Sequence, residues 1–193
     1  MHAHLQEVLP LLDDSRAVLK TAIDQVPEGL RRTRPSSERW SVAEVLEHLV
    51  KVNRLFAERI ATAVAEAKAA GLGPERQPRD PLAANVMRAL KDRTERRPAR
   101  DIVFPTGNVE TSVAWAELDR AREEVRAAVL AADGLALGGV TAEHRFFGVL
   151  TVYQWVELVA AHEGRHADQI RDRCGGSFVI AYRAVGTAGF EGQ

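Results

Sequence analysis

Two histidines, His162 and His166, lie four residues apart in a stretch whose apolar residues recur at helical spacing. At about 100° per residue, a helix would place the two imidazoles about 40° apart on one face, beside Trp155 and Leu158. Neighbouring helix turns bring such a pair within reach of one point, so both rings could bind one metal ion. Alone, the pair is explained equally well as two satisfied histidines at a polar helix end.

A third histidine lies in another predicted helix, over residues 41–70. Ser41 is a good N-cap and Glu44, three residues later, completes a capping box, which favours a helix start here. The same angular arithmetic places His48 on the inward face, whereas Glu47 falls off that face and is expected to be solvated. The predicted inward stripe comprises Val45, His48, Val52, Leu55, Phe56 and Arg59.

Two more segments carry apolar residues at a period close to 3.6, one near the N-terminus and one in the middle of the chain. Pro10 falls inside the first, so that helix either begins near Pro10 or is kinked there. Four amphipathic helices predict an all-α fold, a four-helix bundle that forms a single domain over residues 1–193. The predicted core helices cover residues 5–26, 41–70, 113–132 and 150–173.

The second and third predicted helices are joined by a long decorated connection, residues 71–112, which is rich in proline and glycine at its start and contains a short helix near 82–93. A connection of this length usually has a function or crosses the end of a bundle, so it either covers a site or braces a dimer. Residues 138–148 are expected to form a loop. The sequence pattern does not place the glycine-rich tail, residues 175–193.

Metal sites in helical bundles are built from side chains that project inward from facing helices, and His48 with His162 and His166 fits that arrangement. Three neutral imidazoles with an open position are typical of a catalytic divalent metal. A closed structural site would need four protein ligands, and the chain has only one cysteine. Zinc and nickel both suit imidazole ligands, and the sequence does not choose between them.

Two polar residues beside the predicted ligands are candidates for catalytic roles. Glu44 lies one turn before His48 and could orient that imidazole or act as a base, although its capping role explains it as well. Gln169, near His166, could contact a ligand or a substrate, or could hydrogen-bond the backbone near the helix end. His144 is more simply explained as a loop histidine than as a ligand.

Composition excludes several classes of protein. With 46% hydrophobic and 27% charged residues and a net charge of -1, the chain is an ordinary globular protein without a basic patch for nucleic acid. No apolar run is long enough to span a membrane, and the N-terminus lacks the order of a signal peptide. A single cysteine argues against a secreted, disulfide-stapled scaffold, so a cytoplasmic location is expected.

The motifs resemble those of the DinB-like (DinB/YfiT) metal-binding four-helix bundles. One is Trp-Ser-x-x-Glu-x-x-x-His over residues 40–48, and the other is Gln-Trp-x-x-x-x-x-x-His-x-x-x-His-x-x-Gln-Ile over residues 154–170. Phe-Phe-Gly-Val-Leu-Thr, residues 146–151, also resembles the approach to the last helix in many members. Relatives often have His-Pro before the Phe-Gly of this loop, whereas Arg145 and Phe146 follow His144 here, which puts any role of the loop in doubt.

The resemblance implies an up-down-down-up bundle, a divalent metal on His48, His162 and His166, and a homodimer. Better-understood members include bacillithiol transferases and mycothiol-dependent maleylpyruvate isomerases, so a low-molecular-weight thiol cosubstrate is implied as one option. The sequence therefore predicts a metal-dependent enzyme acting on a small molecule, a thiol S-transferase or isomerase or a hydrolase, whose open site activates a thiol or water. The alternative is a non-catalytic, stress-associated bundle that binds metal or another ligand.

Overall fold

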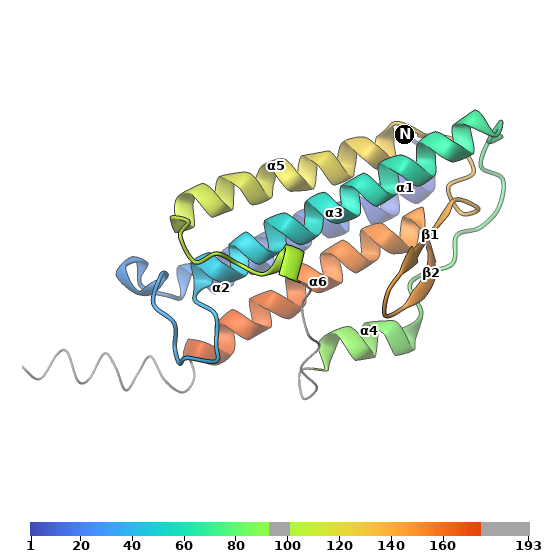
Figure 1. The fold of residues 1–193 in the computed structure, drawn as a ribbon. Coiled ribbons are helices and arrows are strands. Elements are labelled where there is room, and N and C mark those ends of the chain that lie inside the picture. The colour runs from blue at the N-terminus through green and yellow to red at the C-terminus, as the bar shows by residue number, and fades with distance from the viewer. Residues whose placement is uncertain (93–100, 175–193) are drawn as a thin grey trace, which may run out of the picture.

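The computed structural model describes residues 1–92 and 101–174, which form a mainly helical structure with one small sheet. Four long helices lie side by side (Figure 1): α2 (Pro10–Asp24), α3 (Val42–Ala69), α5 (Thr111–Leu130) and α6 (Val152–Cys174). Helix α3 packs mainly against α5 and α2 mainly against α6, while α3 and α6 meet along a shorter stretch. The tail after Cys174 lies outside the described residues.

The N-terminal helix predicted over residues 5–26 is divided at its proline. Helix α1 (Ala3–Val8) ends one residue before Leu9, and Pro10 is the first residue of α2. Proline lacks an amide hydrogen and has a fixed φ, which suits the first turn of a helix. Of the two outcomes left open, the structure therefore has the one in which a helix begins at Pro10. A short 3-10 turn, Glu28–Leu30, follows α2.

Helix α3 begins where the sequence predicts. Ser41 Oγ accepts from the backbone N–H of Glu44, and the carboxylate of Glu44 accepts from the backbone N–H of Ser41, so the predicted capping box is confirmed. Most of the inward stripe is buried, including His48, but Arg59 is exposed and donates to the carbonyl of Glu143. The prediction of an inward Arg59 was wrong because a long basic side chain reaches solvent or a surface acceptor more easily than it enters an apolar core.

A small antiparallel hairpin occupies the region that was expected to be loop. Strands β1 (Thr141–His144) and β2 (Gly148–Thr151) pair with His144 opposite Gly148, and α6 starts directly after β2. Gly148 has a φ of 73°, a conformation that glycine adopts without strain and that fits the end of a tight hairpin turn. The all-α prediction describes the helices but not this hairpin, whose strands are too short to give a clear alternating pattern.

The connection between α3 and α5 runs back along α6. It contains α4 (Ala84–Lys91), close to the predicted short helix, and a 3-10 turn at Asp101–Val103. The Glu157 carboxylate on α6 accepts from Arg79 and from the backbone N–H of Leu82. Arg165, also on α6, donates to the carbonyl of Leu90 at the end of α4, with an N···O distance of 2.7 Å. These contacts fix the described part of the connection against α6.

Apolar residues from all four long helices fill the interior, and Trp155 and Leu158 of α6 are almost fully buried in it. Trp155 packs edge-to-face against Phe56 of α3, with ring centroids 5.0 Å apart. These two rings connect α3 to α6 about two helix turns from His48 and His162. Among the described helices, none has the length and apolar character needed to cross a bilayer.

Candidate metal centre

The three histidines predicted as ligands come together between α3 and α6. His48 lies in the second turn of α3, and His162 and His166 lie on consecutive turns of α6. One nitrogen from each ring lies within 4.8 Å of the other two, a spacing at which all three could hold one ion. The ring centroid of His48 is 5.5 Å from that of His162 and 5.0 Å from that of His166. The predicted convergence is therefore confirmed, while metal ligation itself stays a prediction.

The tautomer of His48 is set by a backbone carbonyl. Nδ1 of His48 lies 2.9 Å from the carbonyl oxygen of Val103. Because a carbonyl oxygen only accepts, Nδ1 must carry the proton, and the lone pair of the neutral ring then lies on Nε2. Metal-binding histidines are held in this way by an acceptor on the other ring nitrogen.

His166 is held by a side chain of its own helix. Its Nδ1 lies 2.7 Å from Oε1 of Gln169, which accepts, so the lone pair of this ring also lies on Nε2. Gln169 thus contacts the imidazole of His166, while a role in orienting a metal ligand stays a prediction. Nε2 of His166 faces Nε2 of His162 at 3.2 Å.

The two imidazole nitrogens on α6 are spaced to share one divalent ion. Two nitrogens that each lie about 2.0–2.1 Å from one ion, at a near-tetrahedral angle, are about 3.3–3.4 Å apart. The 3.2 Å between the two Nε2 atoms on α6 is close to that separation. Nδ1 of His162 is buried and has no hydrogen-bond partner among the described residues, and because Nε2 of His166 carries a lone pair, Nε2 of His162 is the donor in the hydrogen bond between them. This ring would present an Nε2 lone pair to an ion once its proton moves from Nε2 to Nδ1.

Burial keeps the imidazoles neutral. It lowers the pKa of His162 and His166 well below the ordinary value for histidine, and the neighbouring imidazoles and Arg165 lower the pKa of both further. Burial also lowers the pKa of His48, against the opposing effect of the Val103 carbonyl. Neutral imidazole is the form that binds metal, so the three rings are ready to do so without losing a proton.

Aromatic rings line the sides of the cluster. The ring centroid of Trp40 is 5.0 Å from that of His48, and the ring centroid of Phe56 is 6.4 Å from that of His162. Such walls exclude water and lower the local dielectric constant, which strengthens electrostatic interactions at the centre.

The segment that supplies the Val103 carbonyl is fastened to α3 by Glu47. The Glu47 carboxylate accepts from the backbone N–H groups of Thr106 and Gly107, at 2.8 Å and 3.1 Å, and Lys51 donates to the carbonyl of Phe104 at 2.7 Å. Glu47 is buried, so the prediction that it is solvated was wrong. Its angular position on the helix is off the bundle face, but a segment almost sixty residues away in sequence returns to cover it.

Glu44, a candidate base or orienting group, is engaged at the start of its own helix. Its carboxylate accepts from Ser41 N at 2.7 Å and from Nε of Arg34 at 2.9 Å. Burial would raise the pKa of Glu44, but the hydrogen bonds from Arg34 and Ser41 outweigh it and hold the pKa below its usual value. The contact with Ser41 belongs to the capping role that was the alternative explanation of this residue, the contact with Arg34 is an ion pair, and a catalytic role of Glu44 stays a prediction.

The contribution of Glu44 to stability should depend on pH. The pKa of Glu44 is lower in the folded state than its unfolded value of about 4.3. The ionised carboxylate therefore stabilises the fold fully at pH values above the unfolded pKa, and this stabilisation is lost as the pH falls through the folded pKa. We expect Glu44→Gln to be less stable than the wild type at pH 7 and equally stable in acid. Thermal unfolding followed by circular dichroism from pH 7 down to about pH 3 checks this. A stability difference that is the same at both ends of the range would contradict it.

His144, Arg165 and His4 lie outside the group of three histidines. His144 is in the hairpin, where its ring stacks on Phe147 with centroids 4.8 Å apart, and it does not belong to the group of three converging nitrogens. Arg165 donates to backbone carbonyls at the end of α4. His4, near the N-terminus, packs against Tyr153 in another part of the molecule. The preference for a non-ligand role of His144 agrees with this placement.

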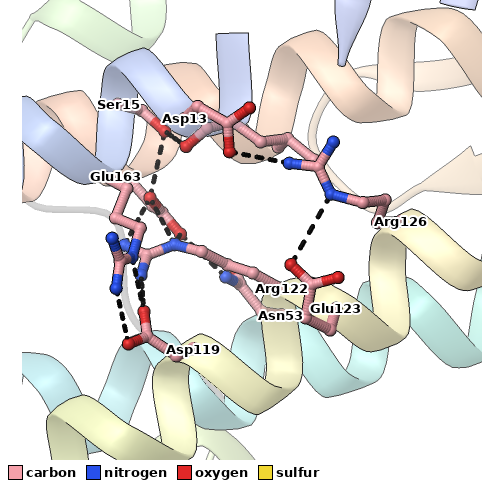
Figure 2. Close-up of polar contacts among 10 residues, drawn as sticks. Asp13, Ser15, Asn53, Asp119, Arg122, Glu123, Arg126 and Glu163 are labelled. Carbon is pink, nitrogen blue, oxygen red and sulfur yellow. Dashed lines mark hydrogen bonds and ion pairs between the residues drawn. The ribbon is translucent and has the colours of Figure 1, made fainter. Parts of the chain in front are cut away.

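Sequence reasoning missed Glu163, which directly follows His162. Glu163 is fully buried and forms an ion pair with Arg122 of α5, which is 4% exposed (Figure 2). Glu163 lies about 100° around the helix from His162, and this angle could have indicated that its side chain is buried against other helices. The partner lies 41 residues away in sequence, and no local pattern identifies it.

Comparisons with known proteins agree with the motifs. The model of the DinB superfamily matches residues 11–170, a range that contains all three histidines. The chain is also 29% identical, over 140 residues, to a protein of Bacillus subtilis (strain 168) described as uncharacterized protein YuaE. That alignment covers 72% of this chain and 80% of the relative.

Proposed function

The chain belongs to the DinB superfamily, and from that premise we propose that it is a divalent-metal-dependent enzyme whose ion is held by His48, His162 and His166. The observation that carries the proposal is the convergence of three imidazole nitrogens, in two of which an acceptor on Nδ1 directs the lone pair to Nε2. Three protein ligands leave one position open, which is the arrangement of a catalytic centre and not of a closed structural one.

A divalent ion in such a site lowers the pKa of a bound water or thiol and so supplies a nucleophile near neutral pH. The residues of the chain orient and shield it: the Val103 carbonyl and Gln169 fix two of the rings, and Trp40 and Phe56 exclude water from the sides. This chemistry suits S-transfer or isomerisation with a thiol cosubstrate, or hydrolysis, of a small molecule. Zinc and nickel both accept three imidazole ligands.

We extend the proposal to the architecture. The course of the four long helices in Figure 1 supports an up-down-down-up four-helix bundle, with α2 and α6 running one way and α3 and α5 the other. We also propose that residues 1–193 form one domain, that the protein is a cytoplasmic homodimer, and that it binds neither nucleic acid nor a membrane. Sedimentation velocity at several protein concentrations tests the dimer, which a monomer at all of them would contradict.

Gln169 should strengthen metal binding through His166. Replacing Gln169 with leucine removes the acceptor on Nδ1, so the ring loses both its orientation and its fixed tautomer. Partners of this kind typically contribute about 10–100-fold to metal affinity, and we expect zinc to bind Gln169→Leu weaker by that factor. Competition with a chromophoric chelator measures the affinity. Gln154→Leu, on the same helix but bonded to the Pro81 carbonyl, is the matched control. Equal zinc affinity of Gln169→Leu and the wild type would show that Gln169 has no such role.

A thiol titration tests the proposed function. We expect a low-molecular-weight thiol to change the visible spectrum of the cobalt-substituted protein, because sulfur bound to cobalt gives charge-transfer absorption. Zinc- or nickel-loaded wild type should also turn over substrates in a screen of thiol conjugation and hydrolysis, and His162→Ala should not. Equal activity of His162→Ala and the wild type would contradict metal catalysis. A metal-loaded protein without thiol binding or turnover would favour the non-catalytic binding bundle instead.

A further inference from the structure

A carboxylate of α6 that lies about 100° around the helix from His162 ties together all four long helices. Glu163 accepts from Ser15 of α2 at 3.0 Å, from Asn53 of α3 at 2.9 Å, and from Arg122 of α5. Arg122 contributes two nitrogens: Nε lies 2.8 Å from Oε1 and Nη2 lies 2.8 Å from Oε2 (Figure 2). Both oxygens of the carboxylate therefore have donors from other helices.

Stability alone does not account for this arrangement. Glu163 and Asn53 have no exposed surface, and Arg122 is 4% exposed, so the charges are removed from water. Buried ion pairs can often be replaced by packed apolar side chains with no loss of stability. Apolar contacts tolerate small slides and rotations of one helix against another, whereas hydrogen bonds are directional and fix one arrangement. The network therefore determines where α6 lies, in addition to holding it in place.

The placement of α6 also places two of the three histidines of the proposed metal site, His162 and His166. Glu163 lies between His162 and His166 in the sequence of α6, and Asn53, five residues after His48 on α3, bonds the same carboxylate. A slip of α6 by one residue would move its imidazoles by about 1.5 Å along the helix axis and turn them by about 100°. Such a movement is large compared with the tolerance of about 0.5 Å within which a metal site must be held.

We propose that Glu163, through its ion pair with Arg122 and its hydrogen bond from Asn53, is a positioning residue that fixes the register of α6 against α3. It thereby sets the spacing of His48, His162 and His166 without touching the ion. This inference rests on the proposed metal site and assigns a role to a residue outside it.

Glu163→Gln tests the role. The amide keeps the shape of the side chain but loses the charge that pairs with Arg122. We expect cobalt and zinc to bind it about tenfold more weakly than the wild type, and the d–d spectrum of the cobalt protein to change because the ligand geometry changes. Val129→Ala is the control for lost stability, since Val129 is buried in α5 two turns after Arg122. It should lower the melting temperature without altering cobalt affinity or spectrum.

The double variant Arg122→Met/Glu163→Met keeps the test valid even where Glu163→Gln folds poorly. Its apolar side chains restore packing but not directional bonds, so we expect a folded protein with weakened metal binding and an altered cobalt spectrum. Wild-type affinity and spectrum in the folded double variant would overturn the positioning role and leave the metal site standing. Failure of the wild type to bind cobalt or zinc would contradict the metal site itself, and with it this role of Glu163.

Discussion

Single replacement of His48, His162 or His166 with alanine is expected to weaken binding of zinc by more than about a hundredfold. Partners that only orient a ligand typically contribute about 10–100-fold, so the loss of a ligand should exceed that range. Each variant leaves two imidazoles, which cannot supply the three contacts of the proposed centre. Chelator competition, with the metal content checked by elemental analysis, measures the effect.

The controls for this experiment are histidines outside the cluster. His144→Ala removes an imidazole from the hairpin and His4→Ala removes one that packs against Tyr153, and neither should alter the affinity for zinc. Circular dichroism separates loss of a ligand from loss of the fold, and His162→Ala is the clearest case because His162 is only partly buried. Wild-type affinity in any one of the three ligand variants would remove that residue from the proposed centre.

Arg122→Ala is expected to lower the free energy of unfolding by about 3–5 kcal/mol. Removing one partner of a buried ion pair leaves the other charge without compensation, and this is more damaging than the pair itself is stabilising. Glu163 would keep its hydrogen bonds from Ser15 and Asn53 but would lose the only cation that contacts it among the described residues. Urea unfolding at pH 7, followed by circular dichroism, gives the free energy.

Arg120→Ala is the matched control, because Arg120 lies on the same helix, is 69% exposed and pairs with Glu117. Exposed ion pairs contribute about 0–1 kcal/mol, so this variant should be close to the wild type. If Arg122→Ala were no less stable than Arg120→Ala, Glu163 would have to gain solvent or another partner in the variant. The ion pair would then have no special importance for the fold.

The sequence predicts the parts of this molecule that depend on local chemistry. The Ser41–Glu44 capping box places the start of α3, Pro10 limits the start of α2, and the four-residue spacing of His162 and His166 puts both on one face. Each of these features depends on residues within one or two helix turns, so helical geometry is enough to deduce them.

Contacts between distant segments could not be predicted in the same way. The Val103 carbonyl that fixes His48 is 55 residues away, and the Arg122 that pairs with Glu163 is 41 residues away. Helical periodicity separates inward from outward faces but does not say which segment covers an outward face. Glu47 was therefore predicted to be solvated although the Thr106 and Gly107 amides bury it.

The most direct test of the proposed centre is elemental analysis of the wild-type chain, purified without chelator and without nickel affinity resin. Three neutral, converging imidazoles predict about one equivalent of a transition metal, zinc or nickel, per chain. The same preparation of His162→Ala should contain almost none. Less than about a tenth of an equivalent in the wild type, after incubation with zinc and removal of the excess, would contradict the account.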